Sequence, residues 1–326
     1  MEREEQSELC FPQAANISCR KPSAGWSQGV SGSLLLYLTC ALTVLLNLLV
    51  ITSISHFRQL RSPTNLLLLS LAVSDLLVGL LVWPGEIHLN AACWTHGDIA
   101  CSLYNLVSFT VTSASVGNMV LLSADRYAAV CRPLRYKVNV TVKRIRLCVC
   151  CCWLCSLLLS SVLMKDDLAH PGKHASCYGE CGIRIEYAAA VLDLLVTFIL
   201  PLGVIAALYG RVFAAAASQA RAMRSRVTGG ERQRSLPMRA KKSELKAART
   251  LGILVLVFLM CFCPYYCVTL AADGSPGASV VLNVYYLNSC VNPLIYAWFY
   301  PWFRRAVKHI VTLRVLRPGS RRADLL

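Results

Sequence analysis

Residues 66–90 read LLLLSLAVSDLLVGLLVWPGEIHLN, and this stretch decides the fold class. An apolar segment of about 20 residues is long enough to cross the hydrocarbon core of a bilayer as a helix, and it is too long for one strand. Two carboxylates, Asp75 and Glu86, interrupt it at positions where lipid makes charge costly. The stretch therefore predicts a transmembrane helix that carries functional acids.

Six further apolar blocks of similar length follow the same pattern, separated by short polar stretches that contain Pro and Gly. The seven blocks run roughly over residues 33–56, 66–90, 100–124, 146–164, 188–212, 248–271 and 279–300. Blocks of this length do not alternate as the strands of a membrane barrel do. The sequence therefore predicts an all-α membrane protein, a seven-transmembrane helix bundle.

The charge of the chain fits this topology. Lys and Arg outnumber Asp and Glu by 33 to 17, which gives +16, yet only 15% of residues are charged, 56% are hydrophobic and mean hydropathy is +0.52. This composition excludes a disordered basic chain and argues against a nucleic-acid partner. Six of the 33 cations fall in segments 1–32, 91–99, 165–187 and 272–278, and the other 27 lie elsewhere. The positive-inside rule then predicts an extracellular N-terminus and a cytosolic C-terminus.

The predicted outer side carries a glycosylation sequon at Asn16-Ile17-Ser18 and six of the 17 cysteines. An even number of cysteines in an oxidising compartment indicates up to three disulfides. The other eleven cysteines are interpreted as small apolar side chains that contribute to packing. The six outer cysteines are Cys10, Cys19, Cys93, Cys101, Cys177 and Cys181.

Three carboxylates lie within predicted spans, and each is a functional candidate because lipid penalises charge. Asp75 is mid-span, where it predicts a small hard cation, with a protonated, hydrogen-bonded aspartic acid as the alternative. The polar partners expected at the same depth, which make up a sodium site, are Ser115, Asn288, Ser289 and Asn292.

Asp193 lies eight residues before Pro201, about two turns towards the outside. No Lys or Arg occupies the outer half of any span to neutralise it, so a cationic ligand is the predicted partner, and a water-solvated rim carboxylate is the alternative. Glu86 either lines the same cavity or extends to the interface.

Asp125-Arg126-Tyr127 closes the third span at its cytosolic end. Arg126 can pair with Asp125 and with Glu244, which heads the sixth span. An ion pair that links two helices conditionally is a switch element. A solvated interfacial arginine is the alternative interpretation.

One motif in each helix, in chain order, resembles the fingerprint of rhodopsin-class G-protein-coupled receptors over about residues 33–313. No GxSxG, HExxH or P-loop motif competes with it, so we expect no enzyme activity. The matching residues are Asn47, Leu71-Ala72-Val73-Ser74-Asp75, Asp125-Arg126-Tyr127, Trp153, Pro201, Cys261-Phe262-Cys263-Pro264 and Asn292-Pro293-Leu294-Ile295-Tyr296.

A narrower resemblance is to trace amine-associated receptors. It rests on residues 286–296, continuing through Phe299-Tyr300-Pro301-Trp302-Phe303-Arg304, and on Cys93-Trp94, the 97–101 segment and Asn-Ile-Ser-Cys near the N-terminus. The resemblance implies a small amine agonist and a stimulatory or olfactory heterotrimeric G protein acting through cyclic AMP. It also implies disulfides from Cys101 to Cys181 and from Cys10 to Cys177, which leaves Cys19 with Cys93.

Two positions depart from the family pattern. Amine receptors usually hold the ligand ammonium with a third-helix Asp seven residues after the disulfide cysteine, and here that position is Ser108. Asp193 occupies a fifth-helix position that is acidic in some fish olfactory members. Ser108 and Asp193 together predict an inverted pose, with the ammonium on Asp193 and the ligand tail towards Ser108 and Tyr286. The second departure is Phe262, where relatives commonly carry Trp.

Residue spacing predicts that the ligand-binding side chains line one cavity in the outer half of the bundle. Several of them are aromatic, and the faces of aromatic rings attract an ammonium group. With Asp193 and Glu86 at opposite ends, the cavity is also a candidate for a diamine. The expected set is Glu86, Ser108, Phe109, Thr112, Asp193, Thr197, Phe262, Tyr265, Tyr266, Tyr285 and Tyr286.

Activation is expected to be a population shift in which the sixth helix swings at Pro264 and Arg126 parts from Glu244, with Tyr296 completing the switch. Residues 302–311 are amphipathic and predict a short cytosolic helix on the inner leaflet. The expected divisions are an extracellular N-terminus over 1–32, a receptor domain over 33–300 and a cytosolic helix and tail over 301–326, in a multi-pass plasma-membrane protein.

Two other functions fit parts of the pattern. Ser108 leaves a receptor for a non-amine ligand, such as a peptide or lipid, as an alternative. A membrane transporter also uses intramembrane acids, but the seven spans show no internal duplication and no broken pair of helices.

Overall fold

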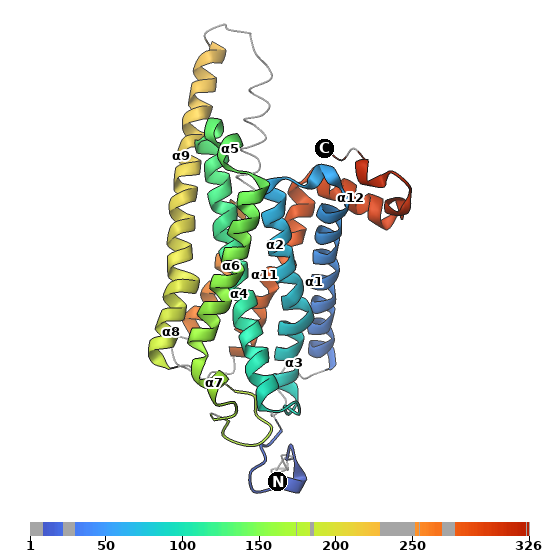
Figure 1. Cartoon of the computed structure of the whole chain (residues 1–326), viewed down its shortest axis with the longest axis vertical. Helices are drawn as coiled ribbons and strands as arrows, with labels where there is room; N and C mark the ends of the chain where they lie inside the picture. The colour runs from blue at the N-terminus through green and yellow to red at the C-terminus, as the bar shows by residue number, and fades with distance from the viewer. Residues whose placement is uncertain are drawn as a thin grey trace.

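The computed structural model describes residues 9–21, 30–173, 175–182, 186–228, 252–253, 255–268, 278–323 and 325. Long helices run side by side along the longest axis of the molecule, and the helix α12 lies across one end of the bundle (Figure 1). The N-terminal segment lies at the opposite end. The predicted seven-helix bundle is confirmed in the described residues.

Five apolar helices in the described part are long enough to span a membrane, at Gly32–His56, Pro63–Leu89, Asp98–Cys131, Val142–Leu163 and Tyr187–Ala215. A shorter apolar helix at Val255–Val268 and α11 (Ala278–Phe299) supply the other two. The first span is α1 (Val30–His56), the third is α4 (Asp98–Cys131) and the fourth is α6 (Val142–Leu163). The second span consists of α2 (Pro63–Leu77), η4 (Val78–Val82) and α3 (Trp83–Ala91). The fifth is α8 (Tyr187–Asp193), η5 (Leu194–Ile199) and α9 (Leu200–Thr228).

Most helices extend beyond the predicted apolar blocks at their cytosolic ends. The third block was expected to end at 124, but α4 continues to Cys131, and α9 continues to Thr228 instead of ending near 212. Hydropathy falls where a helix leaves the hydrocarbon, whereas backbone hydrogen bonding continues into the polar region. The boundary predicted from hydropathy is therefore the membrane edge and not the helix end.

Two spans contain a single π-helical turn, η4 at Val78–Val82 and η5 at Leu194–Ile199. Such turns place one extra residue in the helix and occur frequently at functional sites. Glu86 follows the first turn and Asp193 immediately precedes the second, so each of these two carboxylates sits on the extracellular side of a π turn.

The outer faces of the bundle are apolar where they meet lipid. Large side chains of α1 and α6, such as Leu35, Leu38, Leu154 and Leu158, are more than half exposed. The interior contains a buried polar layer instead, in which Asn47, Asp75, Asn118 and Asn292 have no exposed surface. A water-soluble domain has the reverse arrangement, so this distribution is that of a membrane bundle.

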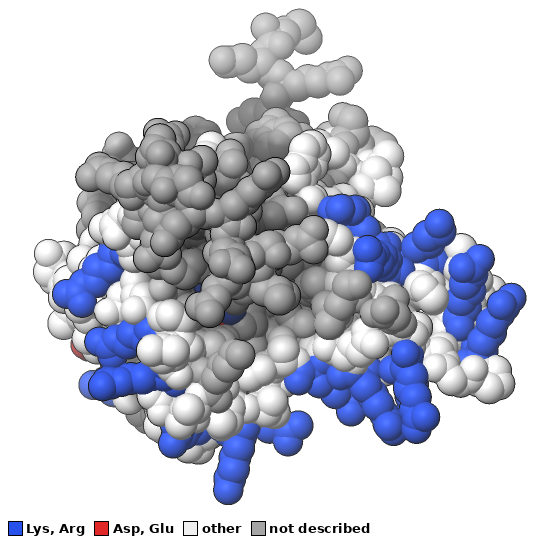
Figure 2. Space-filling model, turned by 90° about the horizontal axis from the view of Figure 1, so that it is seen from above, with Lys and Arg blue, Asp and Glu red and all other residues white. Residues whose placement is uncertain are grey.

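Lys and Arg side chains crowd the end of the molecule that carries α5 (Pro133–Asn139) and α12 (Pro301–Val311), with very few acids visible there (Figure 2). α12 buries Trp302, Phe303 and Ala306 against the bundle while Arg304 and Arg305 stay exposed. The amphipathic helix predicted over 302–311 is therefore present, and this face matches the basic cytosolic side expected from the loops.

Three disulfides cross-link the extracellular end of the molecule, and two of the expected pairings are wrong. Cys101 is bonded to Cys181 as expected. Cys10 is bonded to Cys93, instead of to Cys177, and Cys19 is bonded to Cys177, instead of to Cys93.

Backbone pairing explains the exchange. Ser18 forms a parallel bridge with Tyr178, which brings their chain neighbours Cys19 and Cys177 together. Cys10 donates its N–H to the Cys19 carbonyl at 2.8 Å and lies on the far side of that segment. The bridges of the N-terminal segment cannot be read from cysteine spacing, because they depend on this long-range register.

Candidate ligand-binding site

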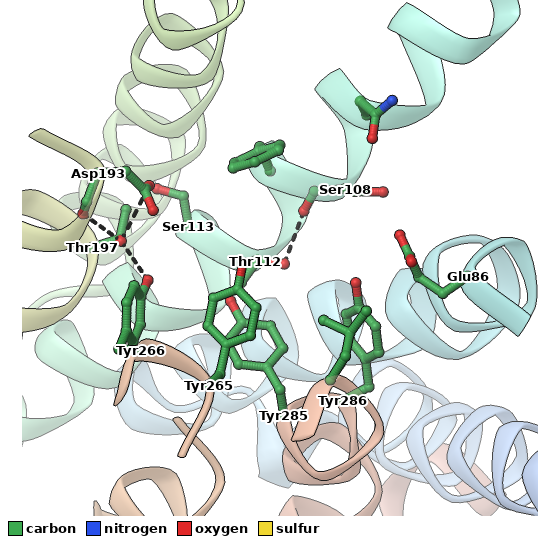
Figure 3. A pocket seen from close by; sticks show the side chains of 13 residues that line it. Glu86, Ser108, Thr112, Ser113, Asp193, Thr197, Tyr265, Tyr266, Tyr285 and Tyr286 are labelled. Atoms are coloured by element: carbon green, nitrogen blue, oxygen red, sulfur yellow. Dashed lines mark hydrogen bonds between the residues drawn. The ribbon is translucent and has the colours of Figure 1, made fainter. Parts of the chain in front are cut away.

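A cavity of about 190 Å³ opens between the extracellular halves of the helices. Its walls come from α3, α4, α8, η5, the helix at Val255–Val268 and α11 (Figure 3). Every side chain expected around an outer cavity lines it except Phe262. The lining residues are Glu86, Asn105, Ser108, Phe109, Thr112, Ser113, Asp193, Thr197, Tyr265, Tyr266, Leu282, Tyr285 and Tyr286.

Asp193 forms one end of the cavity and is held by a neighbouring hydroxyl. Thr197 donates to the Asp193 carbonyl at 2.6 Å and approaches its carboxylate Oδ1 at 3.2 Å. The Thr197 hydroxyl also lies 2.7 Å from the Tyr266 phenol oxygen. In the part of the chain that the structure describes, no Lys or Arg forms an ion pair with Asp193. Neutral groups therefore position the Asp193 carboxylate, which lines one end of the cavity.

Aromatic rings form the wall opposite α4. The ring centroids of Tyr265 and Tyr266 are 5.2 Å apart, and those of Tyr265 and Tyr285 are 4.8 Å apart. Tyr285 and Tyr286 make a further contact at 5.4 Å. Ring faces carry partial negative charge, so a row of four tyrosines beside a carboxylate suits a cationic ligand.

Phe262 does not line the cavity, which corrects its place in the expected ligand-binding set. Its ring lies 4.2 Å from that of Tyr285 and 4.1 Å from that of Phe258, and only 3% of its surface is exposed. Tyr285 lines the cavity and Phe262 packs against it inside the bundle. Phe262 therefore contacts the cavity wall through Tyr285 and does not reach the cavity itself.

Glu86 lies across the cavity from Asp193, with tyrosine side chains between them (Figure 3). It accepts a hydrogen bond of 3.0 Å from the Tyr104 hydroxyl, which also donates to the Val82 carbonyl at 2.8 Å. Gly85 makes this packing possible, since a Cβ there would lie 2.3 Å from the Tyr104 ring. The first alternative for Glu86, that it lines the cavity, therefore agrees with the structure.

The cavity also includes Asn105, Ser113 and Leu282, which the sequence reasoning missed. Asn105 precedes Phe109 by one helical turn, and Leu282 precedes Tyr285 and Tyr286 by a turn, so they share faces with residues already expected. Extending the same helical faces outward identifies them. Glu86 and Asn105 also line a second, outer cavity of about 510 Å³ beneath the three disulfides, and so they mark the boundary between the two spaces.

The polar cluster around Asp75 is assembled as expected. Asn292 donates to the Asp75 carboxylate at 2.8 Å and Ser115 donates to it at 3.4 Å. Asn288 lies next to it, 3.4 Å from the Asn292 amide, and the Ser289 carbonyl accepts from Asn47 at 3.0 Å. Among the residues that the structure describes, the buried side-chain oxygen of Asn292 has no hydrogen-bond partner. This oxygen-rich donor set fits a small hard cation such as sodium.

At the cytosolic end, Arg126 is bonded to the carboxylate of its neighbour Asp125 and to the Thr64 hydroxyl. Thr64 and Tyr136 each donate to that carboxylate at 2.8 Å. Burial and the Asp125 charge raise the pKa of Tyr136 to about 12, so its phenol stays a neutral donor. Glu244, the other expected partner of Arg126, lies outside the described residues.

Of the remaining expected switch residues, Tyr296 is buried, and Tyr127 and Pro264 are partly buried. Tyr127 packs beside Val130 and Val212 and has the Arg132 guanidinium 5.7 Å from its ring. Tyr296 is 1% exposed, and its hydroxyl has no hydrogen-bond partner in the described residues. Pro264 lies within the helix at Val255–Val268, two residues after Phe262.

A bundle of seven spans with a cavity at one end and a buried Asp-Arg pair at the other defines a class of receptor. The family model of the 7 transmembrane receptor (rhodopsin family) matches residues 46–296. The chain belongs to this family, which consists of G-protein-coupled receptors and not of enzymes.

Individual relatives narrow the class. Trace amine-associated receptor 13c of Danio rerio is 35% identical over 96% of this chain and 95% of its own length. Trace amine-associated receptor 1 of Mus musculus is 36% identical over 95% of this chain and 97% of its own length. The human receptor of that name is 35% identical over 95% and 96%. The chain is thus a rhodopsin-class receptor related to trace amine-associated receptors, with a ligand and a G protein as its partners.

Proposed function

We propose that this receptor binds small amines, with the ligand ammonium held by Asp193. The observation that carries the proposal is a carboxylate with no cationic partner in the described residues, facing a cavity walled by tyrosines. A buried carboxylate of this kind is stabilised by a cation, and an amine supplies one. The names of the relatives point to the same ligand class.

Ser108 supports an inverted pose for the ligand. Its hydroxyl donates to the Tyr104 carbonyl at 3.0 Å and carries no charge, so it cannot replace the third-helix Asp of amine receptors. Asp193 then binds the ammonium from the fifth span, and the apolar tail lies towards Ser108 and Tyr286. The receptor is in this respect of the fish olfactory type that lacks the third-helix acid.

Glu86 extends the proposal to diamines. It faces the cavity from the side opposite Asp193, and a ligand with two ammonium groups contacts both carboxylates at once (Figure 3). The test is Glu86→Gln, which should weaken diamines and leave monoamines unchanged. Unaltered diamine potency in this variant would remove Glu86 from the site.

Signalling is proposed to run through a stimulatory or olfactory G protein to cyclic AMP, at the plasma membrane and with the N-terminus outside. A bound amine favours the conformation in which Tyr285 and Phe262 repack and the sixth span swings at Pro264. A sodium ion among Asp75, Ser115 and Asn292 would stabilise the closed conformation as an allosteric modulator. The divisions 1–32, 33–300 and 301–326 remain the proposed domain limits.

The decisive experiment is a cyclic-AMP reporter challenged with a panel of monoamines and diamines. We expect Asp193→Ala to lower amine potency at least about 30-fold, because removing one partner of a desolvated charge pair costs roughly 2–5 kcal/mol. Glu186→Gln is the matched control, since it removes an exposed carboxylate just before α8, outside the cavity. Surface expression of each variant is measured in parallel.

Two outcomes would contradict the proposal. If no amine activates the intact receptor, a peptide or lipid ligand takes its place. If Asp193→Ala and Glu186→Gln lose potency equally, the cavity carboxylate is not the ammonium partner. Substrate uptake by vesicles that lack G protein would instead support the transporter alternative.

A further inference from the structure

The second span is interrupted where it enters its outer half. The π turn η4 ends at Val82, and Pro84 follows in the first turn of α3. Proline has no N–H to donate and its ring clashes with the preceding turn, so both features weaken the helix at this point. The outer part of the span, which carries Glu86, can therefore change its angle more easily than the end of an uninterrupted helix.

A hydrogen bond to the seventh span is made at this interruption. The indole N–H of Trp83, the first residue of α3, donates to Asn283 Oδ1 of α11 at 2.7 Å. Trp83 is only 1% exposed, and a polar group buried to this extent is costly to leave without its partner. The bond therefore holds the start of α3 against α11.

Each residue of this bond shares a helical face with a residue of the amine cavity. Glu86 follows Trp83 by three residues, and Tyr286 follows Asn283 by the same spacing, about one turn in each helix. The ring centroids of Trp83 and Tyr286 are 6.2 Å apart. Neither Trp83 nor Asn283 is among the residues that line the cavity, whereas Glu86 and Tyr286 both are. The bond therefore acts on a ligand through the residues that it positions.

The segment that carries Glu86 is also held from its other side, by α4. The Tyr104 hydroxyl lies 3.0 Å from the Glu86 carboxylate and 2.8 Å from the Val82 carbonyl oxygen. Contacts from α4 and from α11 thus fix the same short segment. Functional side chains need such supporting contacts, because a shift on the order of 1 Å is enough to impair a binding site.

We propose that Trp83 and Asn283 are positioning residues that determine which length of diamine the receptor accepts. The inference rests on the proposed function, in which Asp193 binds one ammonium group and Glu86 the other. A diamine that is too short or too long can contact both carboxylates only if one of them moves. The bond between Trp83 and Asn283 resists movement of Glu86, so the cavity discriminates between chain lengths.

The test is a cyclic-AMP dose–response series with unbranched diamines of increasing chain length, each paired with the monoamine of the same length. Trp83→Phe removes the indole N–H and keeps a ring beside Tyr286, and Asn283→Leu removes the acceptor. The matched control is Trp153→Phe. It removes an indole N–H that donates to Ser70 Oγ at 3.1 Å, between α6 and α2 and outside the cavity.

We expect Trp83→Phe and Asn283→Leu each to lower the potency of the best diamine about fivefold, the effect of losing one hydrogen bond. The differences in potency between diamine lengths should shrink. Monoamines should change less than about twofold, because they do not need Glu86. Trp153→Phe should leave the ratio of diamine to monoamine potency as it is in the intact receptor.

Two double variants separate positioning from folding. In a Glu86→Gln background, Trp83→Phe should have no further effect on diamines, because the bond acts through Glu86. Trp83→Phe with Asn283→Leu leaves no indole N–H buried without its acceptor. This variant should therefore reach the cell surface better than Asn283→Leu alone, while it still fails to discriminate between diamine lengths.

Four results would overturn the proposal. An unchanged length profile in both single variants, with an intact receptor that still depends on Asp193, would contradict the positioning role and leave the proposed function standing. Equal losses for diamines and monoamines would reduce the bond to a purely structural one. Additive losses with Glu86→Gln would show that the bond does not act on Glu86. The absence of any amine response in the intact receptor would contradict the proposed function, and the positioning role with it.

Discussion

The hydroxyl of Thr197 lies 2.7 Å from the phenol oxygen of Tyr266, and this contact fixes the direction of a short hydrogen-bond relay. Thr197 has one hydroxyl proton and shares it between the Asp193 carbonyl, at 2.6 Å, and the Asp193 carboxylate, at 3.2 Å. Tyr266 must therefore donate to Thr197. Two neutral side chains, from the fifth and sixth spans, thus orient the carboxylate proposed to bind the ammonium.

Removing the phenol oxygen should weaken this relay without removing the charge. We expect Tyr266→Phe to lower amine potency about fivefold, the effect of losing one hydrogen bond of roughly 1 kcal/mol. Thr197→Val should do the same, and the double variant should lose little more than either, because both act through Asp193. Additive losses would show that the two side chains act independently.

Moving the carboxylate from the fifth span to the third should restore amine activation with the ligand in the opposite orientation. Ser108 lines the cavity from α4, so Ser108→Asp places an acid on the wall that amine receptors normally use. We expect Ser108→Asp with Asp193→Asn to regain amine activation that Asp193→Asn alone loses. Dose–response curves in the cyclic-AMP reporter measure this. A double variant as silent as the single one would contradict the inverted pose.

Freeing Arg126 should raise signalling without agonist. Asp125→Asn removes the anionic partner of Arg126 and is expected to increase basal cyclic AMP several-fold. Tyr136→Phe should cause a smaller rise in the same direction, because it removes one donor to Asp125 at 2.8 Å. The high pKa of Tyr136 keeps this bond intact across the physiological pH range. Basal signalling unchanged by both variants would argue against the ion pair as a restraint.

The disulfide pairing can be read directly. Non-reducing proteolysis followed by mass spectrometry should recover peptides that join Cys10 to Cys93 and Cys19 to Cys177. Cys10→Ser and Cys93→Ser should have equal effects on surface expression, since each breaks the same bond, and disulfide loss typically costs 2–5 kcal/mol. Recovery of a Cys10–Cys177 peptide would contradict the structure.

The bundle could be predicted from the sequence because lipid permits so few solutions. A block such as 66–90 must be a helix, and its length is set by the bilayer. The helix ends could not be predicted, since α4 and α9 continue past the hydrocarbon where hydropathy carries no signal. The disulfide pairing could not be predicted either, because the register between Ser18 and Tyr178 is a long-range property.

The cavity was predictable to the extent that helical periodicity holds. Asp193, Thr197 and the tyrosines line it because their spacing puts them on inward faces. Phe262 was predicted to line the cavity because periodicity gives the direction of a side chain. Periodicity does not show that another side chain, here Tyr285, lies between Phe262 and the cavity.

The π turn at Leu194–Ile199 allows the direction of the Asp193 side chain to change without any substitution of the residues around it. Each residue in an α-helix advances the chain by roughly 100° about the axis. Deleting one residue from this turn would rotate Asp193 away from the tyrosines while leaving the inner half of the fifth span, and its contacts with α4, in register. A change in ligand preference can therefore arise here by insertion or deletion, with no substitution among the cavity side chains.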